Sequence, residues 1–164
     1  MIFKTRKHNT DFYNTLLNLS RNMFFYKKIK LKDIFETRIY LMFMHFSVIL
    51  IIFKRKKISF PQEIYDNLFY CIENNLRELG LGDVGVNKEM KNFNKIFYDI
   101  LLKMNKTDKS FKVNKKLATK YFAELINSDD DKYKLFDEYF TNFYHFCFEM
   151  KANIMIKGAI NFRG

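Results

Sequence analysis

A nearly unbroken apolar run constrains the fold of this chain more than any other feature. Residues 39–53 read IYLMFMHFSVILIIF, interrupted only by His45 and Ser47. As a helix, fifteen residues reach roughly 22 Å, which is shorter than the ~30 Å hydrocarbon core of a bilayer. A histidine near the middle would also be costly in lipid. We therefore expect a core helix at the centre of a soluble bundle, with a membrane span and a shallow membrane contact as alternatives.

The rest of the chain repeats the spacing of amphipathic helices. Apolar residues recur at steps of three and four, and no stretch alternates with a period of two between turn residues. Helix starts are expected at Thr10 or Asp11, Asp33 or Thr37, Ser59, Asn87, Asn114 and Asp129–Asp131. The sequence predicts an all-α fold, a single-domain helical bundle of about six helices with a central apolar helix near residues 37–55.

Three of the five glycines lie within six positions, in the segment LGLGDVG that follows the third expected helix. Neither a G-x-x-x-x-G-K-[ST] loop nor a G-x-G-x-x-G turn after a strand is present, which excludes a phosphate cradle. We expect Gly80 to end the helix in a left-handed conformation, with Gly82 and Gly85 permitting a tight turn. Asp83 would accept backbone amide hydrogen bonds, and Asn87 would cap the next helix.

Length and cysteine content indicate one domain in a reducing compartment. The 164 residues suffice for a single core. Cys71 and Cys147 are too few and too far apart for a disulfide framework. The N-terminal residues lack the apolar segment and cleavage site of a signal peptide. We expect a cytoplasmic, bacterial protein.

The positive charge is concentrated at the N-terminal end. Residues 1–57 hold 13 Lys and Arg against three acidic residues, whereas residues 58–164 hold 16 against 15. Such a field attracts nucleic acid or an anionic membrane, although AT-rich coding bias also produces lysine-rich chains. We expect residues 1–32 to form a basic helix and connector packed on a main domain of residues 33–164. The expected electrostatic surface comprises Lys27, Lys28, Lys30, Lys32, Lys54, Arg55, Lys56 and Lys57.

Patterns of catalysis and metal binding are weak. His145 and Cys147 stand two apart on one expected helix and point to different faces, so neither a zinc site nor a nucleophile–base pair follows. The acidic run Asp129–Asp131 lacks the spacing of a calcium loop. We expect no enzyme activity, no metal and no cofactor, and we interpret His45 as a core histidine with its hydrogen bonds satisfied.

The segment Asn74–Lys91, NNLRELGLGDVGVNKEMK, closely resembles the signature of the ubiquinol–cytochrome c chaperone family. The resemblance extends to Ile64–Phe69 and to Met44-His45, which stands where the family has a Leu-His pair. It covers residues 37–104 most clearly. These proteins assist the assembly of respiratory complex III in alphaproteobacteria and mitochondria.

The resemblance implies a chaperone that holds newly made cytochrome b. It also implies work near the ribosome and an anionic membrane surface, with a small accessory chaperone subunit as a further partner. We expect peripheral association with the bacterial inner membrane, or with the matrix side if the protein is organellar. The partner-binding residues that the resemblance implies are Leu76, Arg77, Glu78, Leu79, Gly80, Gly82, Asp83 and Met90, with His45 as a core family position. For Arg77 and Glu78 the alternative is an internal ion pair that ties the corner to a neighbouring helix.

The chain departs from the family pattern at two places. Asp99-Ile100 replaces a Gly-Arg pair after Phe97-Tyr98, and Val113-Asn114 replaces an Arg-Asn pair. These losses put a role for that arginine pair in doubt and permit a diverged client. The alternative functions are an RNA- or ribosome-binding helical protein and a membrane-anchored interaction protein, both without a cytochrome client.

Overall fold

A computed structural model describes residues 11–105, 110–126 and 131–164. In these ranges the regular elements are helices. Asn105 and Val113 form an isolated antiparallel β-bridge. The elements are α1 Asp11–Ser20, α2 Met23–Lys27, α3 Phe35–Arg55, α4 Gln62–Glu78, α5 Asp83–Lys103, α6 Lys115–Tyr121, a 3-10 turn Ala123–Leu125, α7 Asp131–Phe148, α8 Ala152–Gly158 and a 3-10 turn Ala159–Asn161. The predicted all-α bundle is confirmed.

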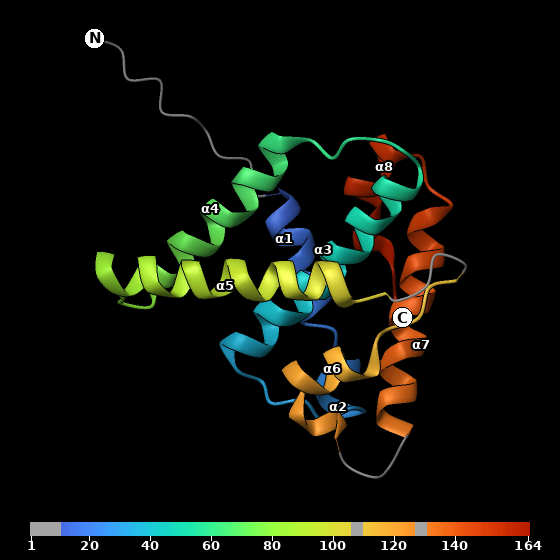
Figure 1. Ribbon diagram of the computed structural model, residues 1–164, viewed down its shortest axis with the longest axis horizontal. Helices are drawn as coiled ribbons and strands as arrows, with labels where there is room; N and C mark the ends of the chain where they lie inside the picture. Colours follow the sequence, from blue (N-terminus) through green and yellow to red (C-terminus); the bar gives the residue numbers. More distant parts are fainter. Residues whose placement is uncertain (1–10, 106–109, 127–130) are drawn as a thin grey trace.

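The apolar run forms α3, which lies in the middle of the bundle (Figure 1). Helices α1, α5 and α7 pack against it from different sides. By length and hydropathy α3 could cross a membrane, but two-thirds of its most apolar window is buried inside the protein. Its position is that of a core helix, because its apolar side chains are already covered by the other helices.

Aromatic side chains fill the space around α3 on two sides. Toward α4 and α5, Phe43 and Phe46 contact Phe97 with ring centroids 5.3 Å apart in each pair. Toward α7, Phe25 and Phe140 lie 6.0 Å apart and surround the ring of His45. The Phe46–Phe97 pair is stacked and the others are tilted or edge-on, and such pairs add to the stabilisation from buried apolar area.

The first expected helix is interrupted. A continuous helix to Tyr26 was predicted, but α1 ends at Ser20 and α2 starts at Met23. The side chain of Asn22 accepts a hydrogen bond from the Phe24 amide at 3.0 Å, and the Tyr26 hydroxyl donates to the Ser20 carbonyl at 2.7 Å. These contacts satisfy polar groups that the break frees, so a new helix can start after two residues. Thr10 lies outside the described residues.

Three expected helix starts are wrong. The N-cap of α3 is Ile34 rather than Asp33 or Thr37, and no side-chain capping hydrogen bond is made there. The N-cap of α4 is Pro61 rather than Ser59, and no side-chain capping hydrogen bond is made there. α5 starts at Asp83, one turn before the expected Asn87, and so includes Gly85. The glycines suggested a longer turn, but the buried Val86 provides an apolar anchor in the first turn of α5.

The boundaries of the C-terminal helices agree with the prediction only in part. Asn114 caps α6 as predicted, with its side-chain oxygen accepting from the Lys116 amide at 3.1 Å. α7 ends at Phe148, so Met150 lies beyond it, and α8 was not predicted. Asp129 and Asp130 lie outside the described residues.

Helices α4 and α5 meet at one end of the long axis of the molecule, whereas α7 and α8 lie toward the other (Figure 1). The segment that joins them, residues 79–82, is the corner that the sequence signature encodes. We call Leu76–Val86 the α4–α5 corner.

Candidate functional site

The end of α4 is closed by a Schellman motif. The Gly80 amide donates to the Arg77 carbonyl at 3.0 Å, and the Leu81 amide donates to the Leu76 carbonyl at 3.3 Å. Gly80 has φ +94°, a left-handed conformation that side chains disfavour. The expected role of Gly80 as the residue that ends the helix is therefore confirmed.

The other two glycines of the corner are not required by the backbone. Gly82 is the N-cap of α5 with φ −74°, and a Cβ atom placed there meets nothing within 4 Å. Gly85 lies in the helix, where a Cβ would make ordinary contact with the Leu81 side chain at 3.5 Å. The prediction that both glycines permit a tight turn is wrong, because neither adopts a left-handed conformation. At Gly82 the backbone is simply left uncovered.

Arg77 links the two helices of the corner. Its guanidinium donates to the carboxylate of Asp83, the first residue of α5, and to that of Glu73, 3.2 Å away on α4. Both carboxylates raise the pKa of Arg77, Asp83 more than Glu73. The carboxylate of Asp83 therefore binds a side chain rather than the backbone amides that we expected. All three side chains remain in contact with solvent.

The corner leaves apolar side chains in solvent. Leu79 is 56% exposed and Val84 is 85% exposed. Leu76 and Val86 are buried, and they anchor the two helix ends to the core. Of the remaining signature residues, Met90 is partly buried and packs against the core. The exposed ones are Arg77, Glu78, Gly80, Gly82 and Asp83. The corner thus presents two apolar side chains on a polar, rigidly closed turn.

His45 lies far from this corner, in the seam between α3 and α7. Its Nδ1 donates to the Leu41 carbonyl at 2.7 Å, so its Nε2 accepts from the Tyr139 hydroxyl at 2.8 Å. Burial lowers the pKa of His45 to about 3, and desolvation raises the pKa of Tyr139. His45 is therefore neutral at physiological pH, with both ring nitrogens occupied by partners in the fold.

The basic residues do not form one continuous surface. Lys27, Lys28, Lys30 and Lys32 lie beside α2, and residues 54–57 lie at the opposite end of α3. In the second group two side chains hold the fold together. Arg55 donates to the Tyr144 hydroxyl at 2.7 Å, and Lys56 donates to the carbonyls of Phe148 and Met150 at the end of α7.

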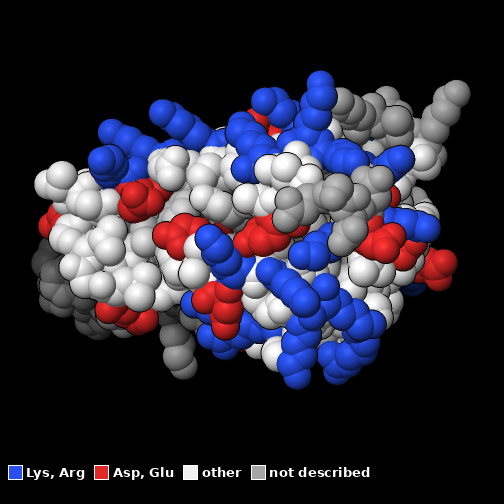
Figure 2. Space-filling model, turned by 90° about the horizontal axis from the view of Figure 1, so that it is seen from below, with Lys and Arg blue, Asp and Glu red and all other residues white. Residues whose placement is uncertain are grey.

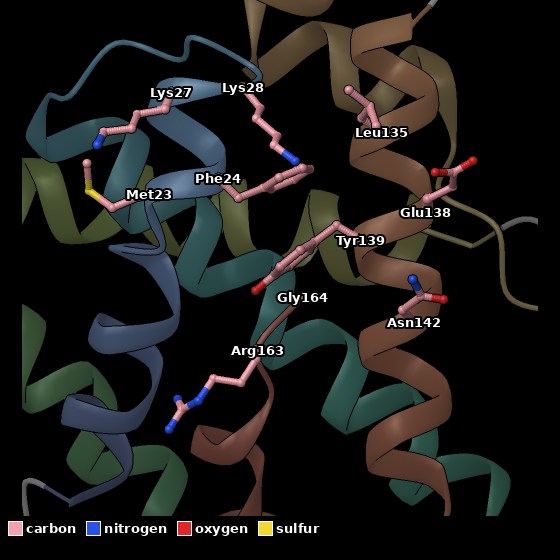
Figure 3. Close-up of a pocket in the computed structure, with 10 residues that line it drawn as sticks. All are labelled: Met23, Phe24, Lys27, Lys28, Leu135, Glu138, Tyr139, Asn142, Arg163 and Gly164. Carbon is pink, nitrogen blue, oxygen red and sulfur yellow. The ribbon is translucent and has the colours of Figure 1, made fainter.

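A hollow that the sequence did not predict lies between α2 and α7 (Figure 3). Its volume is about 440 Å³, and the rings of Phe24 and Tyr139 stack along it with centroids 5.4 Å apart. Lys27, Lys28 and Arg163 supply positive charge and Glu138 negative charge. The residues that line it are Met23, Phe24, Lys27, Lys28, Leu135, Glu138, Tyr139, Asn142, Arg163 and Gly164.

The departures from the family pattern fall together at the contact between α5 and α6. Asp99 binds Lys103 at 2.6 Å, Lys120 at 2.8 Å and the Tyr121 hydroxyl at 2.5 Å. These three donors hold the pKa of Asp99 well below its usual range. Asn114 caps α6 and donates to the Lys103 carbonyl at 3.0 Å. The two arginine positions of the family hold Ile100 and Val113, which are buried in the core. Their neighbours Asp99 and Asn114 make the polar contacts between α5 and α6, and the sequence predicted only the cap at Asn114.

The described residues include no cluster of three or more His, Cys, Asp or Glu side chains that could hold a metal ion. Both cysteines are buried, and desolvation raises the pKa of the Cys147 thiol to about 12 and that of Cys71 in the same direction. The thiols are therefore protonated and poorly nucleophilic at neutral pH.

Comparison with known families gives one match. The model of the family described as Ubiquinol-cytochrome C chaperone matches residues 27–131, which is well over half of the chain and spans α3 to α6 with the α4–α5 corner. No curated protein and no solved structure matches the chain.

Proposed function

The chain belongs to the ubiquinol–cytochrome c chaperone family, and from this premise we propose that it holds newly made cytochrome b through the α4–α5 corner. Family membership supports a role as an assembly chaperone of respiratory complex III. The client and the contact surface are our proposal. The observation that carries it is the exposure of Leu79 and Val84 on a turn whose backbone is closed by its own hydrogen bonds.

A rigid apolar projection suits a client that is itself apolar. Leaving Leu79 and Val84 in water forgoes the favourable burial that each would gain in a contact. Because Gly80 and the Arg77–Asp83 pair fix the turn, binding orders few groups at the surface. The bare backbone at Gly82 permits a partner to approach closely.

The alternative of a membrane anchor is disfavoured by the position of α3. Its apolar side chains pack against α1, α5 and α7, so lipid exposure would require the bundle to open. We propose instead that the protein works peripherally at the cytoplasmic face of the inner membrane, where its client is inserted. Contact with the ribosome and with an accessory subunit stays a prediction.

Site-specific crosslinking tests this proposal. A photoreactive residue at position 79 or 84 should crosslink to cytochrome b in cells that are assembling complex III. The matched control is position 154 on α8, where Ile154 is also about half exposed. Crosslinks to another protein alone, or equal crosslinking to cytochrome b from position 154, would reject the corner as the client site.

Deletion of the gene supplies a second measurement. We expect loss of cytochrome b in redox difference spectra and of assembled complex III in native gels. Restoration by the unchanged protein, but not by a Leu79→Asp/Val84→Asp variant of equal abundance, would link that loss to the corner. Unchanged complex III after deletion would contradict the chaperone role.

A further inference from the structure

The outward face of α5 carries a regular stripe of exposed side chains. Six positions follow one another at alternating steps of four and three: Val84, Lys88, Lys91, Lys95, Tyr98 and Leu102. At ~100° per residue they fall within about 80° of arc. The buried residues Val86, Phe93 and Phe97 lie on the opposite side, toward α3. We call these six positions the α5 stripe.

The lysines of the stripe are not neutralised by the protein. Lys88, Lys91 and Lys95 have no ion-pair partner in the ranges 11–105, 110–126 and 131–164. Two acidic residues of α5 are already engaged, Asp83 by Arg77 and Asp99 by Lys103 and Lys120. The third, Glu89, lies off the stripe. The outward face of α5 is therefore more positive than the composition of the helix suggests.

Apolar side chains stand at both ends of the lysines. Val84 begins the stripe, Leu102 ends it at 77% exposure, and Tyr98 is half exposed between them. The phosphate backbone of a nucleic acid would make no favourable contact with this apolar surface, because phosphate recognition relies on charge and hydrogen bonds. A lipid interface satisfies both kinds of side chain at once.

The positive charge continues past Leu102 onto α6. A hollow of about 510 Å³ opens there, lined by Asp99, Leu102, Lys103, Asn105, Asn114, Lys116, Leu117 and Lys120. Asp99 pairs with Lys103 and Lys120, so the three lysines exceed the one acid and the hollow keeps a net positive charge. Figure 2 views the molecule from below Figure 1, so the face that carries α5 forms its upper edge. Lys and Arg side chains follow one another along that edge.

We propose that α5 is a docking helix that lies flat on an anionic lipid bilayer. The lysines of the α5 stripe would contact lipid phosphates, and Val84, Tyr98 and Leu102 would enter the boundary between headgroups and acyl chains. This inference rests on the peripheral membrane location given in the proposed function and deepens it, since it names the helix and the class of lipid that would hold the protein there. Because α5 starts at the α4–α5 corner, docking would also bring Leu79 to the bilayer surface.

Vesicle co-sedimentation tests the electrostatic part. The purified protein should bind phosphatidylcholine vesicles that contain about a third phosphatidylglycerol, and should bind pure phosphatidylcholine far less. Each lysine near an anionic surface contributes about a factor of five, so K88Q/K91Q/K95Q should weaken binding on the order of 100-fold. The matched control K27Q/K28Q/K32Q removes the same charge beside α2 and should change binding much less. Equal losses in the two variants would overturn the proposal.

Fluorescence tests the orientation without altering charge. The chain contains no tryptophan, so a single introduced indole reports from one place. Leu102→Trp should show a blue shift and protection from a soluble quencher on anionic vesicles. Ile154→Trp on α8 is the control and should show neither. No shift at position 102, or the same shift at both positions, would overturn the docking geometry.

Competition with RNA decides between two polyanions. If the α5 stripe serves RNA, single-stranded RNA should displace the protein from vesicles at low concentration, and Leu102→Ser should leave vesicle binding unchanged. That pair of results would overturn the lipid assignment. We expect Leu102→Ser to weaken vesicle binding several-fold and to leave any RNA binding unaltered. Failure here would not affect the crosslinking test of the corner, which reads client contact in cells.

Discussion

The α4–α5 corner and the seam between α3 and α7 place polar and apolar groups in opposite ways. In the seam, His45 and Tyr139 are polar groups enclosed by aromatic rings, and each polar atom of the His45 ring has a partner within the fold. At the corner, Leu79 and Val84 are apolar groups left in water, supported by an exposed ion pair. The residues of the seam stabilise the fold, whereas the exposed residues of the corner form the surface that we propose for client binding. Substitutions in the two regions should therefore separate stability from partner binding.

The largest effect is expected in the seam. Phe140 is fully buried and contacts His45, Phe136 and Tyr139. Phe140→Ala should lower the free energy of unfolding by about 3–5 kcal/mol, through lost burial and the cavity left behind. Urea unfolding followed by circular dichroism measures this. Phe146→Ala on the same helix removes a partly exposed ring and should cost much less; similar losses would contradict the assignment of the seam as the stabilising region.

The next effect is a dependence on pH. The pKa of His45 is near 3 in the folded protein and about 6.5 when unfolded, so below pH 6.5 the unfolded chain binds a proton that the folded chain does not. The stability that this group contributes is complete above pH 6.5. It should fall by about 1.4 kcal/mol per pH unit as the pH drops toward 3.

Urea unfolding at several pH values, for the unchanged protein and for His45→Gln, isolates this contribution. The variant should lose the extra slope between pH 6 and 4, because glutamine does not titrate. His145→Gln, at an exposed position of α7, is the control and should follow the unchanged protein. If the free energy of unfolding depends on pH in the same way for the protein and the His45 variant, the folded protein protonates His45 as readily as the unfolded chain does. That result would contradict the prediction.

The smallest effects are expected at the corner and sharpen the comparison most. Gly80→Ala should cost about 1 kcal/mol, because φ +94° strains a side chain. Gly82→Ala should cost less than Gly80→Ala, because a Cβ there meets nothing and only the weaker capping preference of alanine opposes it. If the client approaches that backbone, Gly82→Ala should nonetheless weaken crosslinking at position 84. A stable variant with full crosslinking would show that Gly82 is not part of the contact.

Helical periodicity predicted the architecture well because it reports burial directly. The enclosed position of His45 follows from the run of apolar residues around it. The end of α4 at Gly80 follows from the left-handed conformation that glycine permits. The break at Asn22 was missed, because the apolar stripe continues across it and only the side-chain cap reveals it. The start of α5 was misplaced because glycines lower helix propensity, whereas burial of Val86 offsets that loss.

The candidate site was harder to predict. The resemblance indicated the residues of the corner, but their exposure depends on how α4 and α5 meet in space. The α5 stripe was not predicted, because the net charge of residues 58–164 does not show how acidic and basic side chains are placed in space. In residues 58–164 acids nearly balance bases, yet in space Asp83 and Asp99 are bound elsewhere and leave Lys88, Lys91 and Lys95 uncompensated.

The contacts of Arg55, Lys56 and His45 with α7 have a consequence for synthesis on the ribosome. Their partners lie 89 to 94 residues later in the chain. At 5–20 residues per second, α3 emerges roughly 5–20 s before the helix that covers one of its sides exists. During that interval a segment of mean hydropathy 1.6 has the composition of a membrane span, so the nascent chain can be targeted to a membrane or can aggregate. Slow translation through residues 60–130 would lengthen that exposure, so rapid completion of α7 protects the nascent chaperone.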